Sequence, residues 1–240
     1  MSEVATKEDF FADVTRNGQP LTMQEKIEFL EKLNAKLLTS SELAKIHFNT
    51  QVYNVIENSV TTRGGHSEGV ANTAQVLAET FVGRNSKSAD RANEIKLAGL
   101  LSKALGYMHD LGHTPFGHDG EGALGTEMER FDATDDYKNK RKELFGEDYT
   151  KAAGDTEVEV MCYEHNETSS FIGASLLKEF ARKKEIKLSD GAVQYIKTGI
   201  LAHSTSRVEK EPNGNEQKAV RLADKVAYIP QDLLDLLKQG

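Results

Sequence analysis

Apolar side chains recur at helical spacing along most of the chain, and this pattern predicts a helical protein. In residues 21–38 the apolar positions include Ile27, Leu30, Leu33 and Leu37, close to the 3.6-residue period of a helix with one buried face. Small and apolar residues repeat similarly in five further segments. We therefore expect helices over residues 21–38, 67–82, 89–108, 158–183, 189–203 and 216–238.

Side chains that can cap a helix stand at two of these starts. Thr22 is followed three residues later by Glu25, the spacing of a capping box, and Ser189 can cap the segment 189–203. Strand signals are weak, and the best of them is the run of β-branched residues within residues 50–60. The sequence thus predicts an all-α fold with room for one small β-hairpin near residues 50–60.

Two segments have the composition of surface excursions. Residues 131–156 are dense in charge and poor in apolar anchors, and residues 204–217 contain the turn formers Pro212, Asn213 and Gly214. No linker divides the chain convincingly. We expect one domain over residues 1–240, with a helical N-terminal extension over residues 1–45 and a charged surface insertion over residues 131–156.

The composition indicates a cytoplasmic protein. Hydrophobic residues make up 38% of the chain, enough for a core, yet no stretch approaches the roughly 18 apolar residues of a membrane span. The N-terminus lacks the basic and apolar regions of a secretory signal, and the single cysteine, Cys162, excludes an internal disulfide. The net charge of -8 argues against a nucleic-acid substrate, although the 30 Lys and Arg residues can still form a local anion pocket.

The densest chemistry lies in the stretch YMHDLGHTPFGHDGEG, where His109 and Asp110 stand side by side near the end of a predicted helix. Neighbouring helical side chains point about 100° apart, so both reach one metal ion only where the backbone turns away. Gly112 and Pro115 supply that turn. Imidazole nitrogen and carboxylate oxygen without thiolate suit Mn, Fe, Co, Ni or Mg better than a structural zinc cage.

Two further candidate ligands lie far away along the chain. His66 stands in TTRGGHSEGV, where a helix should begin, and Asp224 stands in RLADKVAYIPQD on the last predicted helix. With His109 and Asp110 they would give an ion two nitrogens and two oxygens from three elements. An octahedral ion would keep about two positions for a water and a phosphate oxygen. It would lower the pKa of the water towards neutrality.

This pattern resembles the HD superfamily, which is named for its adjacent His-Asp pair. The run HDLGHTPFGHDGE resembles more closely the signature of its dGTPase-like branch, the deoxynucleoside triphosphate triphosphohydrolases. The segments TQVYNV, TTRGGHS, YEHNETSSFI and LADKVAYIPQDLLD stand in the family's order. The likeness runs from about Thr50 to Asp235, with residues 131–156 unfamiliar. A bare HD pair is weak evidence, whereas the long run with its flanking motifs is strong.

The resemblance implies a role for each matching position. His66, His109, Asp110 and Asp224 match the ligands of one divalent ion per site. The catalytic pair is matched by His118 and Glu121, and the substrate contacts are matched by Arg63, His113, His165, Lys225, Tyr228 and Asp232.

The spacing of these residues agrees with shared faces. His118 and Glu121 stand three apart, so on a helix Glu121 could orient His118 as a general acid or phosphate clamp. Asp224, Tyr228 and Asp232 follow at four-residue intervals and would line one face of a helix. The family's role for Lys225 is to hold phosphate, and those of Tyr228 and Asp232 are to stack on the sugar and to read its 3′-hydroxyl.

The implied reaction releases the whole tripolyphosphate and a free deoxynucleoside after water attacks the α-phosphorus. The substrate would be dGTP or another dNTP, and the resemblance implies a homo-oligomer. Three features depart from the family. His47 stands where a sugar-recognising glutamine is usual, Pro230 interrupts the last helix, and the chain ends at Gly240, as in a compact or truncated variant.

Two other functions stay open at this point. His47 motivates an HD phosphohydrolase that acts on another phosphoester, such as a nucleoside monophosphate or a cyclic nucleotide. The short chain motivates a nucleotide-binding subunit with little catalysis. Outside the motifs, we interpret His47 and His203 as structural histidines and Cys162 as a small packed residue.

Overall fold

The computed structural model describes residues 10–11, 14–49, 62–132, 163–203, 212 and 214–227. The helices of this part are α2 (Met23–Leu38), α3 (Ser41–Ile46), α4 (Arg63–Asn85), α5 (Arg91–Met108), α6 (Gly117–Asp132), α9 (His165–Lys183), α10 (Asp190–Leu201) and α11 (Gly214–Ala227). The strands β1 (Thr15–Arg16), β2 (Gln19–Pro20) and β3 (Ile186–Lys187) form one small antiparallel sheet in the order β2-β1-β3. The predicted all-α fold is confirmed.

Both predicted helix caps are present. The Thr22 side chain accepts a hydrogen bond from the Glu25 backbone, and the Glu25 carboxylate accepts one from the Thr22 backbone, which completes the capping box of α2. The Ser189 hydroxyl accepts a hydrogen bond from the Ala192 backbone at the start of α10. These local signals fixed where each helix begins.

The predicted helix starts at residues 67, 158 and 216 were wrong, and α4 begins four residues earlier than expected, at Arg63. α9 begins at His165 rather than at residue 158, because residues 163–164 are not helical. α11 begins at Gly214, so Glu216 and Gln217, which lay in both the predicted helix and the predicted excursion, belong to the helix. Both side chains are buried, and the Gln217 amide donates to the Tyr195 carbonyl oxygen at 3.3 Å.

The described strands lie away from the hairpin that the sequence suggested. Residues 50–60 lie outside the described part of the chain, whereas β1 and β2 are joined by Asn17 and Gly18, both at positive φ (51° and 76°). Asn-Gly is a favoured two-residue hairpin turn, so the sequence carries a local signal for this pair of strands. Of the predicted insertion, residues 131–132 form the end of α6, and the remainder lies outside the described residues.

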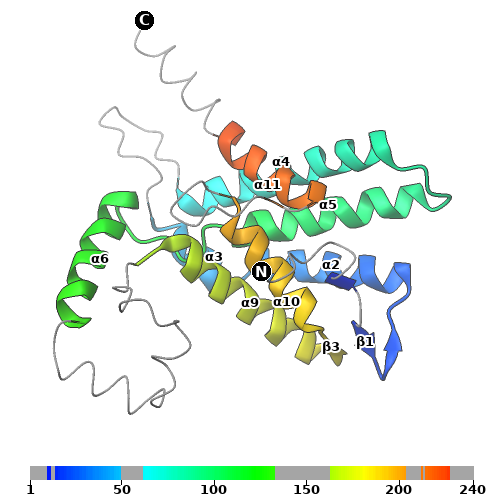
Figure 1. The fold of residues 1–240 in the computed structure, drawn as a ribbon, viewed down its shortest axis with the longest axis horizontal. Helices are drawn as coiled ribbons and strands as arrows, with labels where there is room; N and C mark the ends of the chain where they lie inside the picture. The colour runs from blue at the N-terminus through cyan, green and yellow to red at the C-terminus, as the bar shows by residue number, and fades with distance from the viewer. Residues whose placement is uncertain are drawn as a thin grey trace, which may run out of the picture.

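The core is built around the pair α4 and α5, which run side by side (Figure 1). An ideal Cβ on Gly106 of α5 would lie 2.5 Å from the Ala71 Cα of α4, so the close approach requires glycine at this position. α11 packs across both helices, α2 packs on α5, and α10 packs on α9. One cluster of buried apolar side chains extends from Phe10 to Ala223.

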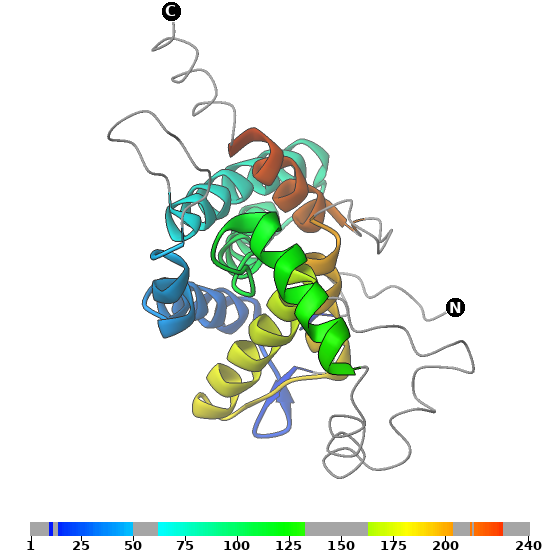
Figure 2. The ribbon, with the colours of Figure 1, turned by 90° about the vertical axis from the view of Figure 1, so that its left-hand side faces the viewer.

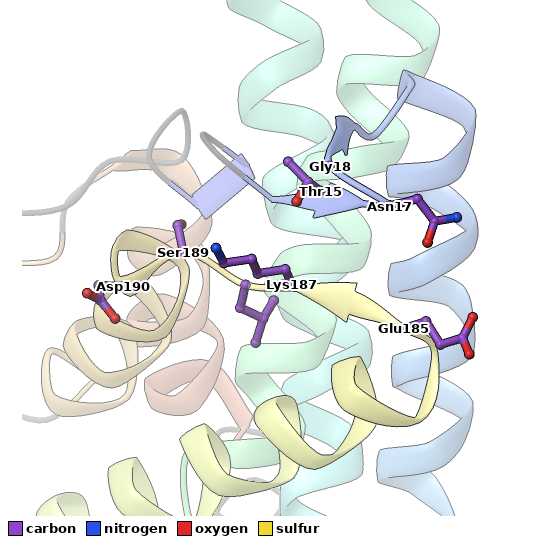
Figure 3. Close-up of a pocket in the computed structure, with 8 residues that line it drawn as sticks. Thr15, Asn17, Gly18, Glu185, Lys187, Ser189 and Asp190 are labelled. Atoms are coloured by element: carbon purple, nitrogen blue, oxygen red, sulfur yellow. The ribbon is translucent and has the colours of Figure 1, made fainter.

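α6 stands at one end of this bundle, at the left in Figure 1 and nearest the viewer in Figure 2. Within the described residues, no helix is both long and apolar enough to span a membrane. A hollow of about 580 Å³ lies at the small sheet, where Thr15, Lys187 and Asp190 are among its lining residues (Figure 3). None of the candidate site residues that the structure describes lines this hollow.

Candidate metal centre and the adjoining histidine cluster

His109 lies at the end of α5 with its ring fully buried. Its Nδ1 donates to the Gly106 carbonyl oxygen at 2.7 Å, which leaves Nε2 as the nitrogen that can bind a ligand. That Nε2 is buried and has no hydrogen-bond partner among the described residues. It lies 3.6 Å from Asp110 Oδ2 and 3.7 Å from Asp224 Oδ1, so two carboxylates face it.

His66 and Asp224 reach the same point from other helices. His66 comes from the first turn of α4, Asp224 comes from α11, and His66 Nε2 lies 2.9 Å from Asp224 Oδ1. One ligand atom from each of His66, His109 and Asp224 lies within 4.8 Å of the ligand atoms of the other two. Metal bonds of about 2.1 Å separate the ligand atoms of one ion by about 3 to 4 Å, so the group could hold an ion. The structure thus brings three of the four predicted ligands into one group, and the fourth, Asp110, lies beside His109.

The electrostatics of the metal-free group follow from its burial. Burial lowers the pKa of His109, but the charges of Asp110 and Asp224 outweigh burial and raise it to about 9. Burial raises the pKa of both carboxyls, but His109 and its neighbours hold each pKa well below the usual range. Two ionised carboxylates therefore face the position that a cation would take.

Arg63, at the start of α4, is buried beside these carboxylates. Its Nη1 donates to Asp110 Oδ2 at 2.9 Å, and its Nε lacks a partner among the described residues. A Cβ placed on Gly117 would lie 3.6 Å from Arg63 Nη2, so the guanidinium also borders the start of α6. The arginine that the resemblance assigns to phosphate thus lies between the candidate metal centre and the second cluster.

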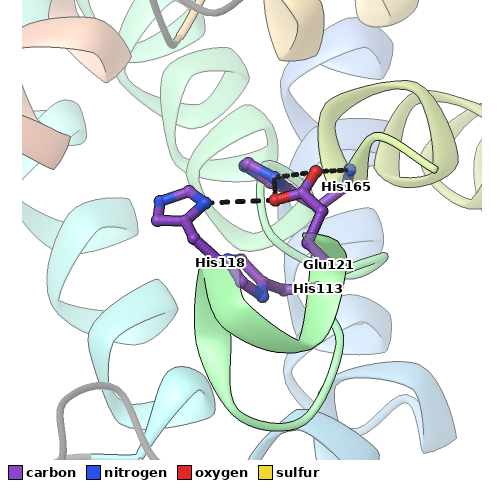
Figure 4. A group of neighbouring side chains, drawn as sticks. All are labelled: His113, His118, Glu121 and His165. Atoms are coloured by element: carbon purple, nitrogen blue, oxygen red, sulfur yellow. Dashed lines mark hydrogen bonds and ion pairs between the residues drawn. The ribbon is translucent and has the colours of Figure 1, made fainter. Parts of the chain in front are cut away.

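The second cluster consists of His113, His118, Glu121 and His165, which converge as Figure 4 shows. The Glu121 carboxylate accepts from His118 Nδ1 at 3.1 Å and from both the backbone and Nδ1 of His165 at 2.8 and 3.0 Å. The His113 ring stacks on the His165 ring, with 4.4 Å between the two ring centroids. Burial lowers the pKa of His113 to about 4. Glu121 therefore joins α6 to the first residue of α9.

The turn that leads into α6 is conformationally unusual. Phe116 has φ 69° and Gly117 has φ 64°, and the Phe116 side chain is 64% exposed. A large side chain rarely adopts this left-handed conformation, so the turn carries strain directly before His118. The His118 side chain is itself 77% exposed, in contrast to the buried His113 and His165.

The remaining predicted residues are placed less closely or not at all. Lys225 follows Asp224 on α11 and is exposed. Tyr228 and Asp232 lie outside the described residues, so the proposed sugar contacts stay predictions. His47 is half-exposed, and its ring nitrogens lie 3.1 Å from Glu68 Oε1 and 3.3 Å from Thr62 Oγ1.

His203, which we interpreted from the sequence as a structural histidine, lies beside the His109–Asp110 pair. It follows α10, is 3% exposed, and its ring centroid lies 4.9 Å from that of His109. Its Nε2, His109 and Asp110 together form another group that could hold a metal ion. Burial and the charge of His109 lower the pKa of His203 to about 4. No sequence motif marks this histidine, because only packing of α10 brings it to the HD pair.

Comparison with known proteins gives the family. The HD domain model matches residues 63–229, and the chain belongs to this family. The chain is also similar to a deoxyguanosinetriphosphate triphosphohydrolase-like protein of Desulfatibacillum aliphaticivorans, with 28% identity over 85% of this chain and 46% of the relative. A relative of the same description from Caldanaerobacter subterraneus is 27% identical over 85% of this chain and 44% of its own length. The chain thus spans less than half the length of these relatives.

Proposed function

We propose that the chain is a metal-dependent phosphohydrolase that converts a deoxynucleoside triphosphate, dGTP or another, to the deoxynucleoside and tripolyphosphate. The observation that carries this proposal is the convergence of His66, His109 and Asp224 from distant segments, with Asp110 beside His109. The family match and the names of the relatives support the choice of substrate class.

The proposed ligands would hold one divalent ion. When bound, the ion supplies an activated water and offsets negative charge on the α-phosphate. Asp110 and Asp224 provide the negative charge that attracts it, and His66 and His109 provide nitrogen ligands. Because the pKa of His109 is raised to about 9 in the metal-free chain, His109 must release its proton before it can bind the ion.

The proposed catalytic pair lies beside this centre. Glu121 holds Nδ1 of His118 at 3.1 Å, so the exposed Nε2 of His118 is free to meet the substrate. As water attacks the α-phosphorus, the bond from phosphorus to the 5′-oxygen breaks, and His118 would donate a proton to that oxygen. The deoxynucleoside then leaves with its 5′-hydroxyl restored.

Further side chains would hold the substrate. We assign the phosphate contacts to Arg63, His113, His165 and Lys225, and the sugar contacts to Tyr228 and Asp232. The cationic Arg63 lies between the two clusters, where it could stabilise charge that develops on the α-phosphate.

Product analysis tests the proposed reaction. The chain is incubated with each of the four dNTPs and with Mn²⁺ or Mg²⁺, and the products are separated by anion-exchange chromatography. Tripolyphosphate and deoxynucleoside should appear in equal amounts. Release of orthophosphate or pyrophosphate instead would reject this reaction.

A second candidate function is hydrolysis of another phosphoester by the same centre. It is favoured by His47, which lies where the family's sugar-recognising glutamine is usual and which packs on Gly64, one residue after Arg63. Turnover of a nucleoside monophosphate or cyclic nucleotide, with none of any dNTP, would select this function. Tight dNTP binding without turnover would instead indicate a nucleotide-binding subunit.

A further inference from the structure

The residues that follow α3 lie against the start of α4. A Cβ placed on Gly64 would lie 2.3 Å from the His47 ring, so this ring packs directly on the backbone of α4. The His47 Nδ1 lies 3.3 Å from Thr62 Oγ1, and its Nε2 lies 3.1 Å from Glu68 Oε1. Both ring nitrogens therefore interact with residues at the start of α4, and the end of α3 is held in place there.

Asn49, two residues further on, forms hydrogen bonds to two segments that carry candidate site residues. Its carbonyl oxygen accepts a hydrogen bond from the backbone of Arg63, the first residue of α4, at 2.8 Å. Its side-chain amide donates to the carbonyl oxygen of His113 at 3.2 Å. Asn49 is half-buried. One residue thus connects the start of α4 to the turn that follows α5.

The turn at His113 is also attached to the start of α9. The Gly112 backbone donates to Ser169 Oγ at 2.9 Å, and the Tyr163 hydroxyl donates to the Gly112 carbonyl oxygen. These bonds fix the turn on the side of α9, whereas the Asn49 amide fixes it on the side of α3 and α4. Loss of the Asn49 amide would therefore leave the first attachment intact and remove the second.

Arg63 and His113, the residues that Asn49 connects, are equipped to bind one anion. They are 5% and 4% exposed, and the Arg63 Nε and the His113 Nε2 have no hydrogen-bond partner among the described residues. Buried polar atoms are normally paired, so unpaired ones beside each other indicate a place for a polar ligand. Burial lowers the pKa of His113, and the charge of Arg63 lowers it further, which agrees with their proximity.

We propose that Asn49 is a positioning residue, which holds Arg63 and His113 at the separation that lets both contact the same phosphate chain. This inference rests on the proposed function, which assigns these two side chains to phosphate. Asn49 would act through its two hydrogen bonds and without contact to the substrate. Such positions matter because a displacement of about 1 Å can lower a rate by about 10²-fold.

Binding of inorganic tripolyphosphate tests this role apart from catalysis. The full chain is saturated with Mn²⁺ and titrated with tripolyphosphate as its Mn²⁺ complex in a calorimeter. Asn49→Ala should bind the complex about tenfold more weakly than wild type, because the hydrogen bond to His113 is lost. The Mn²⁺ content should not change. Asn49→Gln, which keeps the amide donor on a longer side chain, should recover most of the lost affinity.

Asn85, at the other end of α4, provides a matched control. Its amide also donates to a backbone carbonyl oxygen, that of Phe81, but this bond lies within one helix and on the surface. Asn85→Ala should therefore bind the tripolyphosphate complex as wild type does.

Steady-state kinetics with the dNTP that wild type hydrolyses fastest gives a second reading. In Asn49→Ala, kcat should fall and KM should rise, because displaced phosphate contacts weaken binding of both the substrate and the transition state. A residue that only supports the fold would lower the thermal unfolding temperature and leave kcat and KM of the folded chain unchanged.

The outcomes separate this role from the proposed function. If wild type and Asn49→Ala bind the complex equally, the positioning role is overturned and the proposed function stands. Equal losses in Asn49→Ala and Asn49→Gln also overturn it, because the amide is then not what matters. Wild type that neither binds the complex nor hydrolyses a dNTP refutes the proposed function itself. Should circular dichroism show that Asn49→Ala does not fold, Asn49→Ser, whose side chain is too short to reach His113, takes its place.

Discussion

At the scale of single residues, the site separates buried groups from an exposed one. His109 and Asp110 are buried with fixed partners, whereas His118 projects into solvent from the start of α6. A buried ligand is held by packing and is costly to alter, because removal leaves its partners without compensation. An exposed acid-base group can be altered without damage to the fold. The two kinds of residue therefore predict different outcomes of substitution.

Asp110→Asn should abolish both metal binding and turnover. The amide has the same shape but lacks the negative charge that faces His109 and Arg63. Mn²⁺ content after dialysis and the rate of dNTP hydrolysis measure the two effects, and His47→Gln is the control that should retain the metal. An Asp110→Asn chain that is metal-free yet active would falsify the assignment of the centre.

His118→Ala should retain Mn²⁺ but lower kcat by about 10², the usual scale for loss of one acid-base or charge-stabilising group. Because the side chain is 77% exposed, the free energy of unfolding should change by less than about 0.5 kcal/mol. Steady-state kinetics and urea unfolding provide the two readings. Undiminished kcat would remove His118 from the proposed mechanism.

At the scale of elements, the site depends on how closely α4 and α5 approach. α4 carries Arg63 and His66, α5 leads into His109 and Asp110, and Gly106 permits the contact with Ala71. The distance between the helices thus sets the distance between candidate ligands. α6 is attached differently, through the hydrogen bonds that Glu121 accepts from His165.

Gly106→Ala should destabilise the fold by about 1 to 3 kcal/mol, because the added methyl group would meet the Ala71 backbone at 2.5 Å. Separation of the helices should also weaken Mn²⁺ binding. The matched control is Gly69→Ala, also within a helix, where a Cβ meets nothing within 4 Å. That control should stabilise the chain by about 0.5 to 1 kcal/mol. Urea unfolding that gives both variants equal stability contradicts the packing argument.

The helices that the sequence predicted are those whose burial follows a simple period, as in α2, or whose composition is rich in Ala and Leu, as in α5. α6 was missed because its glycines hide any period, and one of them, Gly120, stands where a Cβ would clash with the Pro115 carbonyl oxygen at 2.0 Å. The strands have two residues each, too few for an alternating pattern. Long-range pairing, not local preference, determines such elements.

The candidate ligands within motifs could be singled out from the sequence, because His109 and Asp110 are adjacent and the flanking segments keep the family's order. The proximity of His203 to Asp110 could not be, since it depends on the packing of α10 and α9. The ion pair between Arg63 and Asp110 is likewise a tertiary contact, 47 residues apart in sequence. The sequence thus indicated which side chains carry the chemistry. The tertiary packing determined which of them lie next to the carboxylate of Asp110.

At the scale of the whole molecule, the buried histidines should govern how stability depends on pH. The fold favours neutral His113 and His203, whose pKa is lowered from 6.5 to about 4, and it favours protonated His109, whose pKa is raised to about 9. The two lowered groups contribute stability above pH 6.5 that is lost as pH falls towards 4. The raised group contributes stability below pH 6.5 that is lost as pH rises towards 9.

The metal-free chain should therefore be most stable near pH 6.5 and lose of the order of 2 kcal/mol on either side. Urea unfolding in chelator at pH 4.5, 6.5 and 9 measures this. With Mn²⁺ present, the loss at high pH should disappear, because a bound His109 is neutral and carries no proton on Nε2. A metal-free chain that gains stability from pH 6.5 to 9 contradicts the prediction.

The division into one domain with an N-terminal extension and an insertion stays a prediction, as does assembly into a homo-oligomer. Within the described part, the helices of residues 23–46 contribute to the same buried cluster as α4, α5 and α9. Sedimentation velocity at several concentrations would report the subunit number. A chain that is monomeric at every concentration would contradict the homo-oligomer that the family resemblance implies.

The left-handed turn at Phe116 has a consequence for anyone who engineers this protein. A large aromatic side chain there is unfavourable for the backbone and gains little from burial, so a screen for heat tolerance alone would favour glycine or asparagine at position 116. The same replacement would make the turn that orients His118 more flexible. Variants selected for heat tolerance and variants selected for turnover should therefore differ first at position 116.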